Sequence, residues 1–250
     1  MSDFLLKMAG YRFAIHSLYP SIEKQCAGYC SALTDGEPVD ETVTMTEEDI
    51  AFEEEANIRQ ARVEHIPAQD FPPDYLETVG IHRKIAEFLS HQNAALFHGA
   101  LIELDGEGYL FTAKSGTGKT THIRNWFRQF PNCHVVNGDK PVLRIEGDRV
   151  IGYGTPWAGK EGYQNNTSVP VRAIILLGRD TENHIEPVRP REAISGLIVQ
   201  TYRAADNGGI ARTMQFLSQV VRRVDLYRLG CNMDPESALV AYRGMQKGNE

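Results

Sequence analysis

The chain has 250 residues, of which 42% are hydrophobic and 24% charged, so it carries enough apolar side chains to form a packed core. Its formal net charge of −7 argues against a nucleic-acid partner. The longest apolar runs, such as residues 173–177, have the length of a strand, so no membrane partner is expected. The first residues show no basic segment followed by an apolar stretch, which predicts a cytoplasmic protein.

Residues 1–74 are expected to form a small α+β annex. Alternating residues at 11–15 predict a strand. Thr46, followed by acidic residues, predicts the N-cap of a helix that continues to about residue 62. A pair of prolines at 72 and 73 then introduces a second predicted helix, whose apolar residues recur at helical spacing up to residue 89. We therefore divide the chain into a candidate substrate-binding annex, 1–74, and a second domain, 75–250.

The second domain alternates strand and helix patterns, which is typical of the α/β class. The runs 96–102 and 108–112 are predicted strands joined by an Asp105-Gly106 hairpin turn. Further strands are predicted at 134–136, 142–145, 150–153, 171–177 and 225–229. Further helices are predicted at 119–130, 191–202, 210–222 and 235–245.

A glycine-rich loop connects the strand 108–112 to the helix that begins at Lys119. Glycines let successive backbone N–H groups point at one anion, and the start of a helix adds further donors and partial positive charge. In such a loop Lys119 can reach the β- and γ-phosphates of a nucleoside triphosphate, and the Thr120 hydroxyl can bind Mg²⁺. The candidate nucleotide-binding residues are Ser115, Gly116, Thr117, Gly118, Lys119, Thr120 and Thr121.

The loop departs once from the standard phosphate-loop pattern, because Ala113 occupies the position of its first glycine. The remaining Gly-x-Gly-Lys-Thr string lies between a predicted strand and a predicted helix, which is the context that the motif requires. A glycine turn before an ordinary helix is the alternative interpretation.

Four residues outside the loop are candidates for the same site. Asp139 follows a predicted strand about twenty residues after Lys119 and suits Mg²⁺, whereas the alternative is an ordinary aspartate in a tight turn. In the glycine-rich segment 154–162, Lys160 is a candidate for phosphate and Glu161 for metal or substrate; a rigid surface turn is the alternative. His98 is a catalytic candidate on the strand before the hairpin, although a lone histidine there is more often structural.

These motifs resemble a known family. Phe97-His98-Gly99-Ala100 together with residues 108–120 resembles the core of bacterial HPr kinase/phosphorylase, and Ser115–Thr120 also looks like the kinase motif of ATP-dependent PEP carboxykinase. Residues 137–141 and 154–161 look like short HPr-kinase-like proteins, some of which phosphorylate a serine of a ribosomally made precursor peptide. The resemblance covers about 75–250 and does not extend to residues 1–74.

The resemblance implies an α/β, P-loop core of the PEP-carboxykinase/HPr-kinase type, with a mixed sheet and flanking helices. It also implies a kinase that uses ATP and Mg²⁺ to transfer the γ-phosphoryl group to a serine-like hydroxyl on a peptide, protein or small molecule. In that interpretation Asp139, Lys119, His98 and Lys160 are catalytic, and Thr120, Asp139 and Glu161 hold the metal. Assembly into a homo-oligomer is left open.

One position departs from the HPr-kinase pattern. That family has two adjacent acids after the strand, one of which serves as the catalytic base, whereas this chain has Gly138-Asp139. Either Asp139 is the base, with Glu161 assisting the metal, or the base comes from elsewhere. The missing acid keeps a second hypothesis open, a nucleotide-binding sensor or partner protein without transfer activity. A decarboxylating PEP-carboxykinase-like enzyme is disfavoured by the short chain.

Overall fold

The computed structural model describes residues 1–204 and 206–246. The chain forms two compact units, Met1–Phe88 and Leu89–Glu250, and the division lies near the end of helix α3 (Pro73–Ser90). The division that we expect at residue 74 precedes this helix and stays a prediction. In the described part of the chain, no helix combines the length and the apolar character needed to cross a membrane.

The first unit contains a four-stranded sheet in the order β3-β1-β2-β4. Its strands are β1 (Ser2–Met8), β2 (Tyr11–Ser17), β3 (Cys30–Ala32) and β4 (Glu41–Thr44). Ala9 and Gly10 join β1 to β2 with positive φ at both residues, as a two-residue hairpin requires. The predicted strand at 11–15 is confirmed. The sequence does not signal β1, because Phe4, Leu5 and Leu6 are all buried and their run does not alternate.

Three helices complete this unit, and two of them were predicted. They are α1 (Ser21–Gln25), α2 (Glu47–Glu64) and α3. Thr46 and Asp49 form a reciprocal capping box, in which the Asp49 N–H donates to Thr46 Oγ1 (3.3 Å) and the Thr46 N–H to Asp49 Oδ2 (3.1 Å). This pair satisfies two backbone donors at the helix start and confirms the predicted N-cap.

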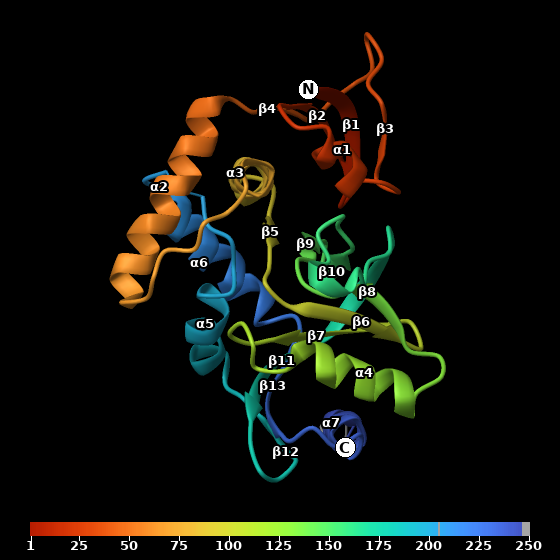
Figure 1. Cartoon of the computed structure of the whole chain (residues 1–250). Helices are drawn as coiled ribbons and strands as arrows, with labels where there is room; N and C mark the ends of the chain where they lie inside the picture. The colour runs from red at the N-terminus through yellow and green to blue at the C-terminus, as the bar shows by residue number, and fades with distance from the viewer. Residues whose placement is uncertain (205, 247–250) are drawn as a thin grey trace. The chain divides into compact units, whose positions relative to one another are not determined.

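The second unit is built on a nine-stranded mixed sheet (Figure 1). Its strands are β5 (Ala94–Leu96), β6 (Ala100–Leu104), β7 (Glu107–Thr112), β8 (His134–Asn137), β9 (Val142–Glu146), β10 (Arg149–Tyr153), β11 (Ser168–Arg179), β12 (His184–Pro187) and β13 (Asp225–Cys231). The long strand β11 pairs with antiparallel β10 near its start and with parallel β7 and β13 further along. Strands β7, β6 and β8 follow in this order beside it, each antiparallel to its neighbour.

Helices cover both faces of the central strands, and strand alternation assigns each side chain to a face. Helices α4 (Lys119–Gln129) and α7 (Glu236–Gln246) pack with Tyr109 and Phe111 of β7. Helices α5 (Pro190–Ile198) and α6 (Gly209–Val220) pack with Leu110, the residue between them, on the other face. Successive strand residues point to opposite faces, so the packing on both faces fixes the register of β7. It thereby also fixes the position of Thr112, where the strand ends and the glycine-rich loop begins. The structure therefore has the mixed α/β architecture with flanking helices.

Three expectations about the elements need correction. The run 96–102 is two strands rather than one, because the chain changes partner at residues 97–99: β5 pairs with β9, and β6 pairs with β7 and β8. The helix predicted at 191–202 ends at Ile198, and residues 200–202 lie beside residues 96–98. Strand β12 was not expected, since its four residues are mostly exposed and carry no apolar pattern.

Candidate active site

The glycine-rich loop lies between β7 and α4, in the expected strand–loop–helix order. Gly116 and Gly118 have φ of 75° and 121°, values that L-residues rarely adopt, and Gly118 is the N-cap of α4. A Cβ built on either glycine would meet no atom within 4 Å, so the space beside this backbone is open. Open backbone at a helix start is a suitable environment for an anion.

Arg179, at the end of β11, contacts the loop through its carbonyl groups. Its Nε donates to the Thr117 carbonyl at 3.1 Å, and a terminal nitrogen donates to the Gly116 carbonyl. The Thr117 hydroxyl donates to the Lys114 carbonyl at 2.8 Å, which closes the turn from within. The Thr117 N–H also donates to the Lys114 carbonyl at 3.3 Å, whereas Arg179 occupies only carbonyl oxygens of the loop and none of its N–H groups.

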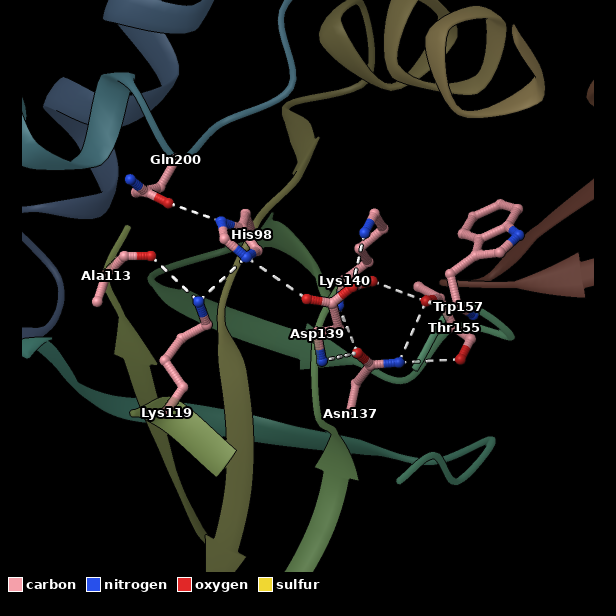
Figure 2. A network of polar contacts seen from close by, with 9 residues as sticks. All are labelled: His98, Ala113, Lys119, Asn137, Asp139, Lys140, Thr155, Trp157 and Gln200. Carbon is pink, nitrogen blue, oxygen red and sulfur yellow. Dashed lines mark hydrogen bonds and ion pairs between the residues drawn. The ribbon is translucent and has the colours of Figure 1, made fainter. Parts of the chain in front are cut away.

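Lys119 is buried and bends back over the start of the loop (Figure 2). Its Nζ lies 3.0 Å from His98 Nε2 and 3.1 Å from the carbonyl oxygen of Ala113. Burial is the largest effect on this ammonium and lowers its pKa below the ordinary value for lysine. Ala113 has no positive φ, so an alanine is tolerated where the standard motif has glycine.

His98 connects Lys119 to Asp139. Its Nδ1 lies 2.9 Å from Gln200 Oε1, and its Nε2 lies 3.5 Å from Asp139 Oδ1 (Figure 2). Burial, followed by the nearby Lys119 charge, lowers the pKa of His98, which favours the neutral ring near pH 7. A neutral ring that accepts from Lys119 at Nε2 carries its proton on Nδ1 and donates it to Gln200.

Asp139 is held by its neighbours at the end of β8. Lys140 Nζ lies 2.6 Å from Asp139 Oδ2. The side-chain oxygen of Asn137 accepts from the backbone N–H groups of Asp139 (2.9 Å) and Lys140 (2.6 Å), which fixes the turn. The Asp139 carbonyl accepts from the Gly99 N–H at 2.9 Å, joining this turn to the segment that carries His98.

A second network fixes the segment after β10. Asn137 Nδ2 donates to the carbonyl (2.9 Å) and to the hydroxyl (3.2 Å) of buried Thr155, and this hydroxyl donates to the Lys140 carbonyl at 2.7 Å. Trp157 is also buried. A Cβ on Gly159 would lie 3.3 Å from the Asp139 Cβ, so the glycine-rich segment passes directly beside Asp139.

The same segment explains the glycine at position 138. A Cβ there would lie 3.0 Å from the Tyr163 Cβ and 3.3 Å from its carbonyl oxygen, both closer than ordinary contacts. The Gly138 N–H donates to that same carbonyl at 2.8 Å. The Cβ and the carbonyl group of Tyr163 therefore crowd the space into which a side chain at position 138 would extend, and they would have to shift to admit it.

The structure brings some of the candidate residues together and leaves others apart. Lys119, His98 and Asp139 form one chain of contacts. Glu161 pairs with Arg124 of α4 at 2.5 Å, one helical turn beyond Thr120, while Lys160 is exposed in the short 3-10 turn η1 (Gly159–Glu161). The hydroxyls of Ser115, Thr120 and Thr121 make no side-chain hydrogen bond with residues that the structure describes.

Sequence reasoning missed Gln200 and Arg179, which contact His98 and the loop from distant parts of the chain. Neither residue carries a local signal, since Gln200 lies 102 positions from His98. Asn137 and Thr155 belong to segments that were singled out, but their buried contact depends on the fold.

The residues present fit Mg²⁺ bound together with phosphates. No cluster of three or more His, Cys, Asp or Glu side chains suitable for a metal occurs in residues 1–204 and 206–246. Mg²⁺, however, is commonly held by one or two carboxylates plus substrate phosphates and water. The Asp139 carboxylate and the Thr120 hydroxyl are oxygen donors of this type.

Comparisons with known proteins add little to this geometry. No family model and no curated protein sequence matches the chain. Among solved structures, the HPr(Ser) kinase/phosphatase from Coxiella burnetii is similar, with 12% sequence identity over 62% of this chain and 99% of that chain. The TM-score is 0.35, so the likeness carries no argument about fold or function here.

Proposed function

We propose that this chain is a Mg²⁺-dependent kinase that transfers the γ-phosphoryl group of ATP to a hydroxyl group, with the P-loop between β7 and α4 as its nucleotide site. The observation that carries the proposal is the position of Lys119. Its ammonium lies between the loop carbonyl of Ala113 and the His98–Asp139 pair. In this proposal the Lys119 side chain therefore lies between a phosphate bound by the loop and the Asp139 carboxylate, which accepts the proton.

The loop and Lys119 bind the triphosphate. The open N–H groups around Gly116 and Gly118 surround the β-phosphate, and Lys119 exchanges the Ala113 carbonyl for phosphate oxygens. Charge-assisted hydrogen bonds to phosphate are about twice as strong as neutral ones, which favours this exchange. Thr120 and Asp139 would hold Mg²⁺, which would neutralise phosphate charge. Glu161, once released from Arg124, is a further ligand in this proposal, and Lys160 a further phosphate contact.

Asp139 accepts the proton in the transfer step. The acceptor oxygen forms a bond to the γ-phosphorus as the bond from that phosphorus to the β–γ bridging oxygen breaks. The hydroxyl proton passes to Asp139, and ADP leaves with the bridging oxygen. A carboxylate can perform this role only within hydrogen-bond reach of the hydroxyl. His98 positions Lys119 by accepting from its ammonium at Nε2.

The test uses γ-labelled ATP and a cell extract. Wild type is compared with Lys119→Ala and Asp139→Asn, and with Lys24→Ala and Asp148→Asn, which make the same charge changes at exposed positions. We expect wild type and both controls to label an acceptor and both site variants to fail. If wild type binds Mg-ATP but labels nothing that depends on Lys119 and Asp139, the kinase proposal is wrong.

Gly138 favours a second candidate, a nucleotide-binding sensor without transfer activity. This chain has no second acid here, and any side chain at this position would be crowded by Tyr163. The same experiment separates the two functions, because a sensor binds Mg-ATP without producing a labelled acceptor.

A further inference from the structure

A cavity of about 440 Å³ borders His98 and Lys140. Its remaining walls are residues 199–203, which follow α5. This segment is attached to residues 96–98 by backbone hydrogen bonds from the His98 N–H to the Gln200 carbonyl (2.7 Å) and from the Tyr202 N–H to the Leu96 carbonyl (2.8 Å). A cavity of this volume accommodates a small molecule or one residue of a peptide.

The walls of the cavity are positively charged. No aspartate or glutamate lines it, whereas Lys140 and Arg203 do. Lys140 already contacts Asp139 at 2.6 Å, so part of its charge is compensated. Arg203 is exposed and makes no side-chain hydrogen bond or ion pair with residues in the described part of the chain. A guanidinium without a protein partner in a cavity favours a carboxylate or phosphate, which it can bind through two parallel hydrogen bonds.

The cavity is also adjacent to the proposed transfer site. His98 lines it and contacts both Lys119 and Asp139, and Gln200 on its wall binds the opposite nitrogen of the same ring (Figure 2). Val199, a large side chain that is 63% exposed, adds an apolar surface at the rim. A compound held here therefore has a charged contact, an apolar contact and a neighbouring carboxylate.

We propose that this cavity binds the phosphoryl acceptor, and that the acceptor carries a carboxylate or phosphate group, recognised by Arg203, in addition to the hydroxyl that is phosphorylated. This inference rests on the proposed kinase function and adds the chemical class of the acceptor. Arg203 is a specificity residue in it, since it contacts the acceptor away from the reacting atoms.

The test measures ADP release from Mg-ATP with acceptors that differ only in charge. The small acids are D-glycerate, L-lactate and 3-hydroxybutyrate, each compared with its neutral amide. The peptide arm compares acetyl-Ser-Asp-amide with acetyl-Ser-Asn-amide, which distinguishes a small-molecule source of the carboxylate from a peptide source. Labelled products from the extract are also identified by mass spectrometry. The variants are Arg203→Gln, Arg203→Lys and the exposed control Arg191→Gln.

We expect turnover with at least one acid and none with its amide. Arg203→Gln should raise the acceptor KM by at least about tenfold, which is about 1.4 kcal/mol. Its kcat and its KM for Mg-ATP should stay within about twofold, Arg203→Lys should recover part of the loss, and Arg191→Gln should behave like wild type.

The inference is overturned if amides are turned over as well as acids, or if Arg203→Gln leaves the acceptor KM unchanged. If none of these test acceptors reacts, the labelled product from the cell extract decides. A product that carries no anionic group besides the new phosphate also overturns the inference. If wild type binds Mg-ATP but phosphorylates nothing, the proposed kinase function itself is wrong. This outcome is seen with wild type alone, before any Arg203 variant is compared, so the two failures can be distinguished.

Discussion

His122 should make the second unit lose stability in acid. It lies on α4, almost completely buried, and its Nε2 accepts a hydrogen bond from the Trp126 indole N–H at 2.9 Å. Its Nδ1 lies 3.4 Å from Ser237 Oγ on α7. A second proton would have to enter at Nε2, where it would face the indole N–H. Burial lowers the pKa of His122 to about 3.

The expected loss follows from the difference between the folded and unfolded pKa. The unfolded chain takes up this proton near pH 6.5, so it binds more protons than the folded chain between pH 6.5 and about 3. Stability therefore decreases as the pH falls through this range. With these two values, His122 alone costs about 2 kcal/mol at pH 5 relative to pH 7.5, and about 5 kcal/mol once the pH is below 3.

The measurement is urea unfolding followed by tryptophan fluorescence at pH 7.5, 6 and 5, in buffer with a chelator. Both tryptophans, Trp126 and Trp157, belong to the second unit, so the signal reports that unit. His122→Gln keeps a hydrogen-bond acceptor for the indole without a titrating group. The variant should have a lower free energy of unfolding than wild type at pH 7.5 because its packing changes. The difference between the two proteins should shrink by about 2 kcal/mol from pH 7.5 to pH 5, because only wild type carries the titrating group. The exposed control His134→Gln should follow wild type. If the difference in unfolding free energy between wild type and His122→Gln stays constant from pH 7.5 to 5, the reasoning is refuted.

Three further predictions concern the loop, its surroundings and a thiol. Gly138→Ala should lower the free energy of unfolding by about 1–3 kcal/mol, measured by heat or urea, because the new Cβ would be crowded by Tyr163. The control is Gly178→Ala, whose Cβ would lie 3.8 Å from its nearest neighbour and whose stability should stay within about 0.5 kcal/mol of wild type. Arg179→Gln should weaken Mg-ATP binding about 3- to 10-fold in calorimetry, since one or two hydrogen bonds worth about 1 kcal/mol hold the loop; unchanged affinity would contradict its positioning role. In native protein a disulfide reagent should modify Cys30 faster than the three buried cysteines, and Cys30→Ser should remove the fast phase. Fast modification that survives Cys30→Ser would count against this prediction.

The sequence was informative at two places where the contacts are local. The N-cap at Thr46 and the strand–loop–helix order around Lys119 each depend on residues a few positions apart, and local pattern predicted both. It failed at residues 96–102, where the apolar run continues while the chain changes sheet partner at Phe97–Gly99. No local preference reports such a change, because partner choice depends on which distant strands are buried beside the segment.

The residues of the candidate site also fall into two groups, those that a local motif predicts and those that only the fold brings together. Lys119 and Asp139 were singled out by motif, but their connection through His98 depends on the segment between β5 and β6, where the chain changes its strand partner. Gln200 and Arg179 were beyond the reach of pattern, since each acts on a residue more than 60 positions away. Whether these residues bind nucleotide stays a prediction.

The close packing at Gly138 bears on how a single carboxylate can serve this site. In the two-acid arrangement that the motifs resemble, metal binding and proton transfer can be divided between neighbouring side chains. Here Tyr163 crowds the position of the first side chain, so in the proposed kinase both roles would fall to Asp139 or be shared with Glu161. The two oxygens of Asp139 already differ, since Oδ1 faces His98 and Oδ2 faces Lys140. A neutral His98 accepts from Lys119 at Nε2 and therefore does not donate to Oδ1. In the proposed function this oxygen would accept the hydroxyl proton, while Oδ2 would hold the metal only by giving up its contact with Lys140. Loss of that contact would release the Lys140 ammonium from Asp139 at the border of the cavity beside His98, where its charge would add to that of Arg203.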